Sequence, residues 1–189
     1  MSTLGILISG RGSNLQAILD AIRARRLEAR VGVVIANLAS AGGLDRAREA
    51  GVPTVVLSHR DYRTREEFDA ALVEKLRSYE VDLVCLAGFM RLLSPVFVRA
   101  FPGRILNIHP SLLPSFPGLH AQRQALEHGV KVTGATVHIV DEELDHGPIL
   151  VQRTVPVLES DDEESLSARI LEVEHQIYPE AIALVLGRR

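Results

Sequence analysis

Short runs of apolar, β-branched residues alternate along this chain with stretches in which apolar residues recur every three or four positions. The first pattern is typical of strands covered on both faces, and the second of amphipathic helices packed on a sheet. The runs predicted as strands cover residues 4–9, 31–36, 53–57, 81–87 and 104–108. This alternation predicts an α/β fold with a mostly parallel, doubly wound sheet and helices on both faces.

The predicted helices carry start and stop signals. The first has an apolar stripe formed by Leu15, Ile18, Leu19 and Ile22. Another covers 44–50 and ends at Gly51, a residue suited to the left-handed position after a helix. A third follows Thr64, which begins a capping-box pattern, Thr-Arg-Glu-Glu. Its predicted apolar face consists of Phe68, Leu72, Leu76 and Tyr79.

The last third of the chain changes character. Residues 132–140 alternate between apolar and polar positions, and 149–155 form another apolar run after a polar loop. We expect these two segments to form an antiparallel strand pair at the edge of the sheet. A final helix is expected to open at Ser160 or Ser165, and Pro179 is expected to kink or end it.

Composition narrows the class of protein. The chain has 189 residues, 47% of them hydrophobic, which fits one domain spanning 1–189. Its formal net charge of -3 gives no field that favours nucleic acid. The single cysteine, Cys85, lies in an apolar run and is expected to be buried. No targeting segment or membrane-length apolar stretch is visible, so we expect a cytoplasmic protein with no membrane partner.

A glycine-rich turn, Ser-Gly-Arg-Gly-Ser-Asn-Leu at 9–15, joins the first strand to the first helix. Glycine lets backbone N–H groups approach a ligand, and a helix start attracts anions. Ser13 and Asn14 can add side-chain donors. Leu15 stands where a dinucleotide-binding fingerprint needs its third glycine, so the turn favours a monophosphate over NAD or a flavin. The alternative is a glycine turn that binds no ligand.

Two polar residues end the strand predicted at 104–108. Side chains alternate along a strand, so Asn107 and His109 point to the same face, and Pro110 marks the carboxyl end. An amide there can donate to a developing oxyanion, and an imidazole can donate or shuttle a proton. The pair predicts a catalytic site, against the alternative of two hydrogen-bonded polar groups with no chemical role.

An acid that tunes this imidazole is expected in the loop at 141–148. Asp141, Glu142, Glu143 and Asp145 are all candidates, and spacing does not choose among them; the loop also fits an ordinary solvated turn. The remaining histidines do not cluster with cysteine or acids, so no catalytic metal is predicted. Ser9 and Ser13 are weak candidates for a nucleophile, because no paired base is evident.

Several separated segments resemble one protein family, the folate-dependent formyltransferases. The matching segments are Leu-Ala-Gly-Phe-Met-Arg-Leu-Leu-Ser at 86–94, Leu-Asn-Ile-His-Pro-Ser-Leu-Leu-Pro at 106–114 and Glu-Leu-Asp-His-Gly-Pro at 143–148. The loop at 10–15 and Glu-His-Gln-Ile-Tyr-Pro at 174–179 narrow the resemblance to members that formylate glycinamide ribonucleotide in purine biosynthesis. His146 departs from the family pattern, in which a small residue stands at this position.

The resemblance implies transfer of a formyl group from 10-formyltetrahydrofolate, as co-substrate, to the amino group of N1-(5-phosphoribosyl)glycinamide. Asn107 would reach the formyl group, His109 would donate a proton, and Asp145 would favour the charged form of His109. The ribonucleotide would be held by Gly12, Ser13, Asn14 and Glu174. The folate would be held by Arg65, Met90, Arg91, Leu92 and Leu93, together with Asn107.

The same resemblance implies that the N-terminal half binds chiefly the ribonucleotide and the C-terminal half the folate. The expected partners are these two small molecules, and the protein would be a monomer or a homodimer. Two alternative functions are a formyl-folate hydrolase and an initiator transfer-RNA formyltransferase. Relatives with those functions carry a further domain, for which we expect no room in this chain. A non-catalytic nucleotide-binding module is the third rival, and it would need the phosphate loop without Asn107, His109 and Asp145.

Overall fold

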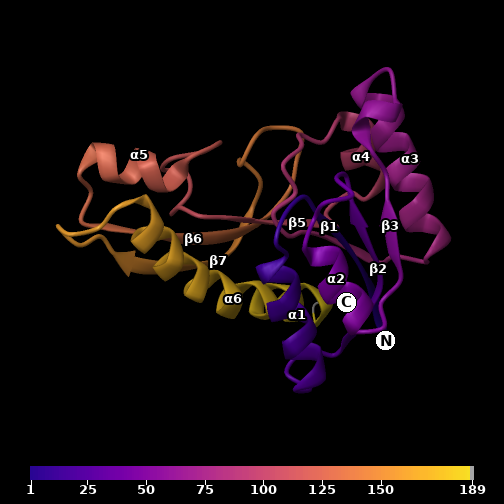
Figure 1. Ribbon diagram of the computed structural model, residues 1–189, viewed down its shortest axis with the longest axis horizontal. Coiled ribbons are helices and arrows are strands. Elements are labelled where there is room, and N and C mark those ends of the chain that lie inside the picture. The colour runs from indigo at the N-terminus through magenta and orange to yellow at the C-terminus, as the bar shows by residue number, and fades with distance from the viewer. Residues whose placement is uncertain (188–189) are drawn as a thin grey trace.

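Seven strands form one mixed sheet in the order β3-β2-β1-β4-β5-β6-β7 (Figure 1). The computed structural model describes residues 1–187. The strands are β1 (Ser2–Ile8), β2 (Ala29–Ala36), β3 (Thr54–Val56), β4 (Leu83–Leu86), β5 (Ile105–His109), β6 (Val132–Ile139) and β7 (Ile149–Pro156). The first five run parallel, whereas β6 is antiparallel to both β5 and β7. The predicted α/β class, parallel sheet and antiparallel edge pair are confirmed.

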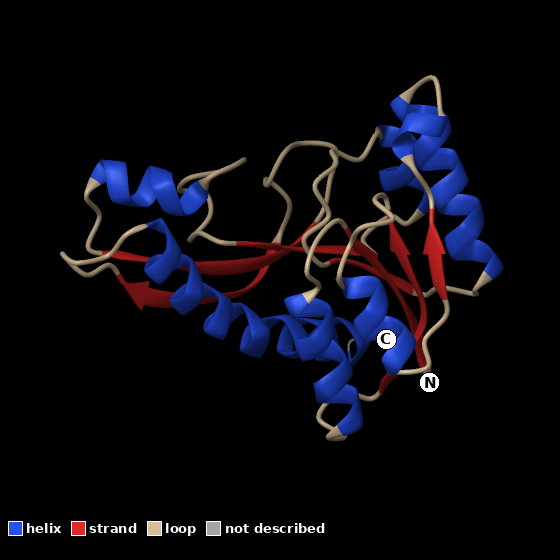
Figure 2. Cartoon of the chain, in the orientation of Figure 1, coloured by secondary structure: helices blue, strands red, loops and turns tan. Residues whose placement is uncertain are grey.

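Helices cover both faces of this sheet, as predicted (Figure 2). They are α1 (Ser13–Arg23), α2 (Gly43–Glu49), α3 (Arg65–Ser78), α4 (Pro95–Ala100), α5 (Ala121–His128) and α6 (Glu163–Gly187), with a 3-10 turn, η1 (His59–Asp61). One core joins α1, α2 and α6 to residues such as Ile6 of β1. The other joins α3 and α4 to residues such as Leu7, because neighbouring side chains of a strand point to opposite faces.

The predicted helix boundaries are partly corrected. Thr64 caps α3 by accepting a hydrogen bond from the Glu67 N–H at 3.1 Å. The Glu67 carboxylate reaches the N–H of Arg63 at 3.0 Å rather than that of Thr64 itself. The helix ends at Ser78, so Tyr79 is its C-terminal cap, and it packs against the same core as Phe68.

The final helix differs more from its prediction. It begins at Glu163, and the cap is Asp162, whose carboxylate accepts from the Ser165 N–H at 2.8 Å. Pro179 lies inside α6, which continues to Gly187, so of the two expectations the one that this proline ends the helix was wrong, and the kink stays a prediction. The buried faces on either side of Pro179, which include Tyr178 and Ile182, keep the helix packed on the sheet across the missing N–H donor.

Candidate active site

Asn107 and His109 end β5, and the loop between β6 and β7 folds back so that Asp145 reaches His109. The Nδ1 atom of His109 lies 3.4 Å from Oδ2 of Asp145, and its Nε2 lies 2.8 Å from the carbonyl oxygen of Phe116. A carbonyl only accepts, so Nε2 carries a proton. Both nitrogens of the buried imidazole therefore face acceptor oxygens, one of a carbonyl and one of a carboxylate.

Asp145 is held in place by the backbone around it. Its Oδ2 also accepts from the Gly118 N–H at 2.8 Å, which ties the β6–β7 loop to the loop after β5. Asp145 has a positive φ of 50°, and Gly147 has no space for a side chain, because an added Cβ would lie 1.8 Å from the Ile139 carbonyl oxygen. The turn at 145–147 thus directs this carboxylate inward, where its side chain is only 8% exposed.

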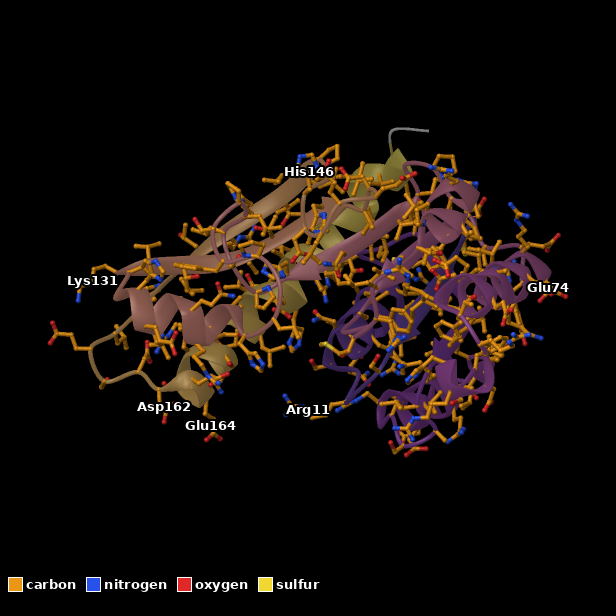
Figure 3. All side chains as sticks on the ribbon, turned by 90° about the horizontal axis from the view of Figure 1, so that it is seen from above. Arg11, Glu74, Lys131, His146, Asp162 and Glu164 are labelled. Atoms are coloured by element: carbon orange, nitrogen blue, oxygen red, sulfur yellow. The ribbon has the colours of Figure 1, made fainter. Side chains whose placement is uncertain are left out.

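Two of the other acids of the loop have different partners. Asp141 pairs with Nδ1 of His146 at 2.9 Å, and Glu142 pairs with Arg99 at 2.8 Å. His146 itself lies at the molecular surface (Figure 3), where its hydrogen bond to Asp141 raises the pKa of the imidazole. Of the four candidates that spacing left open, the structure brings Asp145 to His109.

His138 is a site residue that sequence reasoning passed over. It lies on β6 directly opposite Asn107, and its Nε2 is 3.2 Å from the Asn107 amide nitrogen. Its Nδ1 faces the Ile139 carbonyl oxygen at 3.0 Å, so Nδ1 carries the proton and Nε2 accepts from Asn107. Burial lowers the pKa of His138, which keeps this ring neutral. Its partner on β5 follows from strand register, which no local sequence signal gives.

The glycine-rich loop between β1 and α1 presents its carbonyls to α2. The Gly43 N–H donates to the Gly10 carbonyl at 3.1 Å, and Nε of Arg46 donates to the Arg11 carbonyl at 2.9 Å. Gly12 has a φ of 74°, and a Cβ there would lie 2.6 Å from the Gly43 Cα. With its carbonyls engaged, the loop leaves the N–H groups at the start of α1 available to an anion.

Asn14 and Glu174 meet beneath this loop. The Asn14 amide nitrogen donates to Oε2 of Glu174 at 2.7 Å, and both side chains are buried. Burial raises the pKa of Glu174 to about 7, against the lowering effect of the Asn14 hydrogen bond. The amide of Asn14 is thus directed to Glu174 rather than outward as a free donor. Ser13 is half-buried beside Asn14 at the first position of α1.

The residues proposed to bind the folate lie in the segment 90–93 and at the start of α3. Met90 and Leu92 are 67% and 57% exposed, whereas Arg91 and Leu93 are half-buried. Arg65 is the exposed first residue of α3, and its charge acts on Asp69, whose Oδ2 accepts from the Ser94 N–H at 2.5 Å. Arg65 is thereby near the end of the 90–94 segment, although no hydrogen bond within residues 1–187 joins the two.

Residues 1–187 contain no cluster of three or more histidine, cysteine or acidic side chains arranged to hold a metal ion. None of their helices has the length and hydropathy that crossing a bilayer requires.

With this mixed α/β sheet, residues 3–182 match the model of the family described as formyl transferase. The chain therefore belongs to the formyl transferase family. It is 50% identical over 178 residues to phosphoribosylglycinamide formyltransferase of Escherichia coli (strain K12), covering 94% of this chain and 84% of that protein. Its place within the family is among the phosphoribosylglycinamide formyltransferases, which are enzymes.

Two further comparisons agree with this placement in the family. The chain is 54% identical over 186 residues to the trifunctional purine biosynthetic protein adenosine-3 of Drosophila melanogaster. That match covers 97% of this chain but only 14% of the fly protein. The crystal structure of glycinamide ribonucleotide transformylase 1 from Symbiobacterium toebii superposes with a TM-score of 0.99 at 60% identity, covering 100% of this chain and 89% of that one.

Proposed function

We propose that this protein transfers the formyl group of 10-formyltetrahydrofolate to the amino group of N1-(5-phosphoribosyl)glycinamide. The observation that carries the proposal is the buried contact between His109 and Asp145 beside Asn107, at the carboxyl end of a central strand. Ligands of open α/β sheets bind at these strand ends. The catalytic residues are Asn107, His109 and Asp145, and no metal takes part.

In the proposed reaction, the free amine of the ribonucleotide attacks the formyl carbon, and a tetrahedral intermediate with an oxyanion forms. Asn107 donates a hydrogen bond to that oxygen, and His109 donates a second one after its Nε2–H leaves the Phe116 carbonyl. The carbon–nitrogen bond to the folate then breaks, and the proton lost by the attacking amine ends on the folate nitrogen. One well-placed donor to such an oxyanion is worth roughly 3 to 4 kcal/mol of barrier.

His138 gives Asn107 a fixed orientation in this scheme. One hydrogen of the Asn107 amide is engaged by Nε2 of His138, so the amide plane is set and the second hydrogen is left for the substrate. A preorganised donor of this kind stabilises developing charge without rearranging during the reaction.

The ribonucleotide phosphate is assigned to the N–H groups from Gly12 to Asn14, with Ser13 as a further donor. Glu174 is assigned to the ribose or amine region, because it lies directly beneath Asn14. These assignments draw on both ends of the chain, and the division into a ribonucleotide half and a folate half stays a prediction.

The folate is assigned to Arg65, to the segment from Met90 to Leu93 and to Asn107. A pterin ring needs apolar surface, and large apolar side chains are exposed on the 90–93 segment and next to Gly118 and Asp145 in the sequence. These side chains are Met90, Leu92, Leu119 and Leu144. A monomer or homodimer in the cytoplasm, acting in one-carbon metabolism, is part of the same proposal.

The test is to incubate the protein with 10-formyltetrahydrofolate, with and without glycinamide ribonucleotide. Release of tetrahydrofolate that requires the ribonucleotide, together with formylated ribonucleotide, supports the proposal. Release of tetrahydrofolate and formate without the ribonucleotide would instead indicate a hydrolase. No turnover of either substrate by the folded protein would contradict a catalytic role.

A further inference from the structure

Ser9 lies at the end of β1, immediately before the glycine-rich loop, and its side chain turns toward the neighbouring strand. Its hydroxyl oxygen accepts a hydrogen bond from the Met90 N–H at 2.8 Å. Its backbone N–H donates to the Gly88 carbonyl at 3.1 Å. One residue thus holds both ends of the turn at 88–90, which has no regular secondary structure of its own.

The hydroxyl of Ser9 is itself oriented. It donates to Oδ1 of Asn37 at 2.6 Å, which leaves its lone pairs to accept from Met90. Asn37 is buried at the end of β2, and its amide nitrogen lies 3.4 Å from Nδ1 of His59. These contacts link His59, Asn37 and Ser9 in that order and end at the Met90 N–H.

We propose that Ser9 is a positioning residue for the folate: its oriented hydroxyl fixes the backbone of the segment that begins at Gly88 and carries Met90 to Leu93. The inference rests on the proposed function, which assigns that segment to the folate. Within residues 1–187 the Ser9 hydroxyl bonds to the Asn37 amide and the Met90 N–H, and neither is a base, so its role is not nucleophilic. Asp69 holds the far end of the same segment through the Ser94 N–H.

The phosphate loop does not depend on this hydroxyl. Its carbonyls at Gly10 and Arg11 are held by Gly43 and Arg46 of α2, on the other side of β1 from Met90. Loss of the Ser9 hydroxyl therefore loosens the folate segment and leaves the ribonucleotide loop supported. This separation gives the proposal a readout that a general loss of stability would not produce.

The test compares Ser9→Ala with the wild-type protein in steady-state kinetics and in calorimetric titration with a non-reactive folate analogue. A lost buried hydrogen bond corresponds to a weakening of roughly 5- to 100-fold. We expect the KM for 10-formyltetrahydrofolate and the Kd of the analogue to rise within that range. The KM for glycinamide ribonucleotide should change less than about twofold. Thr133→Val is the matched control, since Thr133 is buried and its hydroxyl has no hydrogen-bond partner within residues 1–187.

A double-mutant cycle with Asn37→Ala tests the orientation of the hydroxyl. Asn37 acts through Ser9, so adding Asn37→Ala to Ser9→Ala should weaken folate binding by less than about twofold more. Unchanged folate binding in Ser9→Ala, or an equal rise in both KM values, would overturn the proposal, as would the same effect in Thr133→Val. Failure of the wild-type protein to bind the analogue would count against the proposed function itself.

Discussion

Glu174 is a buried carboxyl group whose ionisation should make the stability of this protein depend on pH. It lies on α6 with one hydrogen-bond donor, the Asn14 amide, and burial raises its pKa to about 7. Glu174→Gln keeps the size of the side chain and an oxygen for Asn14 but cannot ionise. Comparing the two proteins isolates the free energy of ionising this one group.

The sign and size of this pH dependence follow from the difference in proton binding by Glu174 between the folded and unfolded states. The folded-state pKa lies above the ordinary value of 4.5, so the folded state binds the proton more tightly than the unfolded state does. The stabilisation is fully present below about pH 4.5 and is lost as the pH rises through about 7. Between about pH 5 and about pH 8 the wild-type protein should therefore lose about 2 to 3 kcal/mol of unfolding free energy that Glu174→Gln does not lose.

The assay is urea unfolding of both proteins at these two pH values. Glu180→Gln is the matched control, because it removes an exposed carboxylate from the same helix. We expect the difference between Glu174→Gln and wild type to shift in favour of the glutamine variant at the higher pH, and Glu180→Gln to follow the wild type. If all three proteins show the same pH dependence, Glu174 ionises freely in the folded state and the reasoning fails.

Two further predictions concern the phosphate loop and the ligands. Gly12→Ala should lower the unfolding free energy by more than about 1 kcal/mol, because its positive φ disfavours a side chain and its Cβ would press on Gly43. Gly10→Ala, whose Cβ meets no atom within 4 Å, should change it much less; equal losses in urea unfolding would count against this account. Glycinamide ribonucleotide or a folate analogue, at about 100 times its Kd, should raise the Tm by about 5 to 10 °C. NAD should not change the Tm, and a clear shift with NAD alone would favour a dinucleotide site.

Much of the fold could be predicted because its signals are local. The stripe that begins at Leu15 and the cap at Thr64 are periodic or pairwise patterns that one window of sequence contains. Neither α4 nor α5, which are short helices of six and eight residues, was predicted from the sequence. Pro179 does not end α6, since tertiary packing keeps the helix continuous although local chemistry disfavours proline within it.

The residues of the candidate site, likewise, could be predicted from the sequence only in part. The alternation along β5 was enough to place Asn107 and His109 on one face. The choice of Asp145 among the loop acids, and the role of His138 opposite Asn107, depend on how β6 and its loop fold back on β5. Such contacts are set by register and by a turn with a positive φ, so residue spacing alone could not give them. The resemblance to known formyltransferases supplied Asp145 where spacing did not.

The proposed function depends most on the pair that Asp145 forms with His109, which we propose supports the hydrogen bond to the oxyanion. Asp145→Asn keeps the size of the side chain and the hydrogen bond from Gly118 but removes the charge. Steady-state kinetics with both substrates should show kcat reduced about 100-fold or more, with the KM for glycinamide ribonucleotide within about twofold of wild type, since its phosphate is assigned to the loop at Gly12. A kcat within about twofold of wild type would contradict the account.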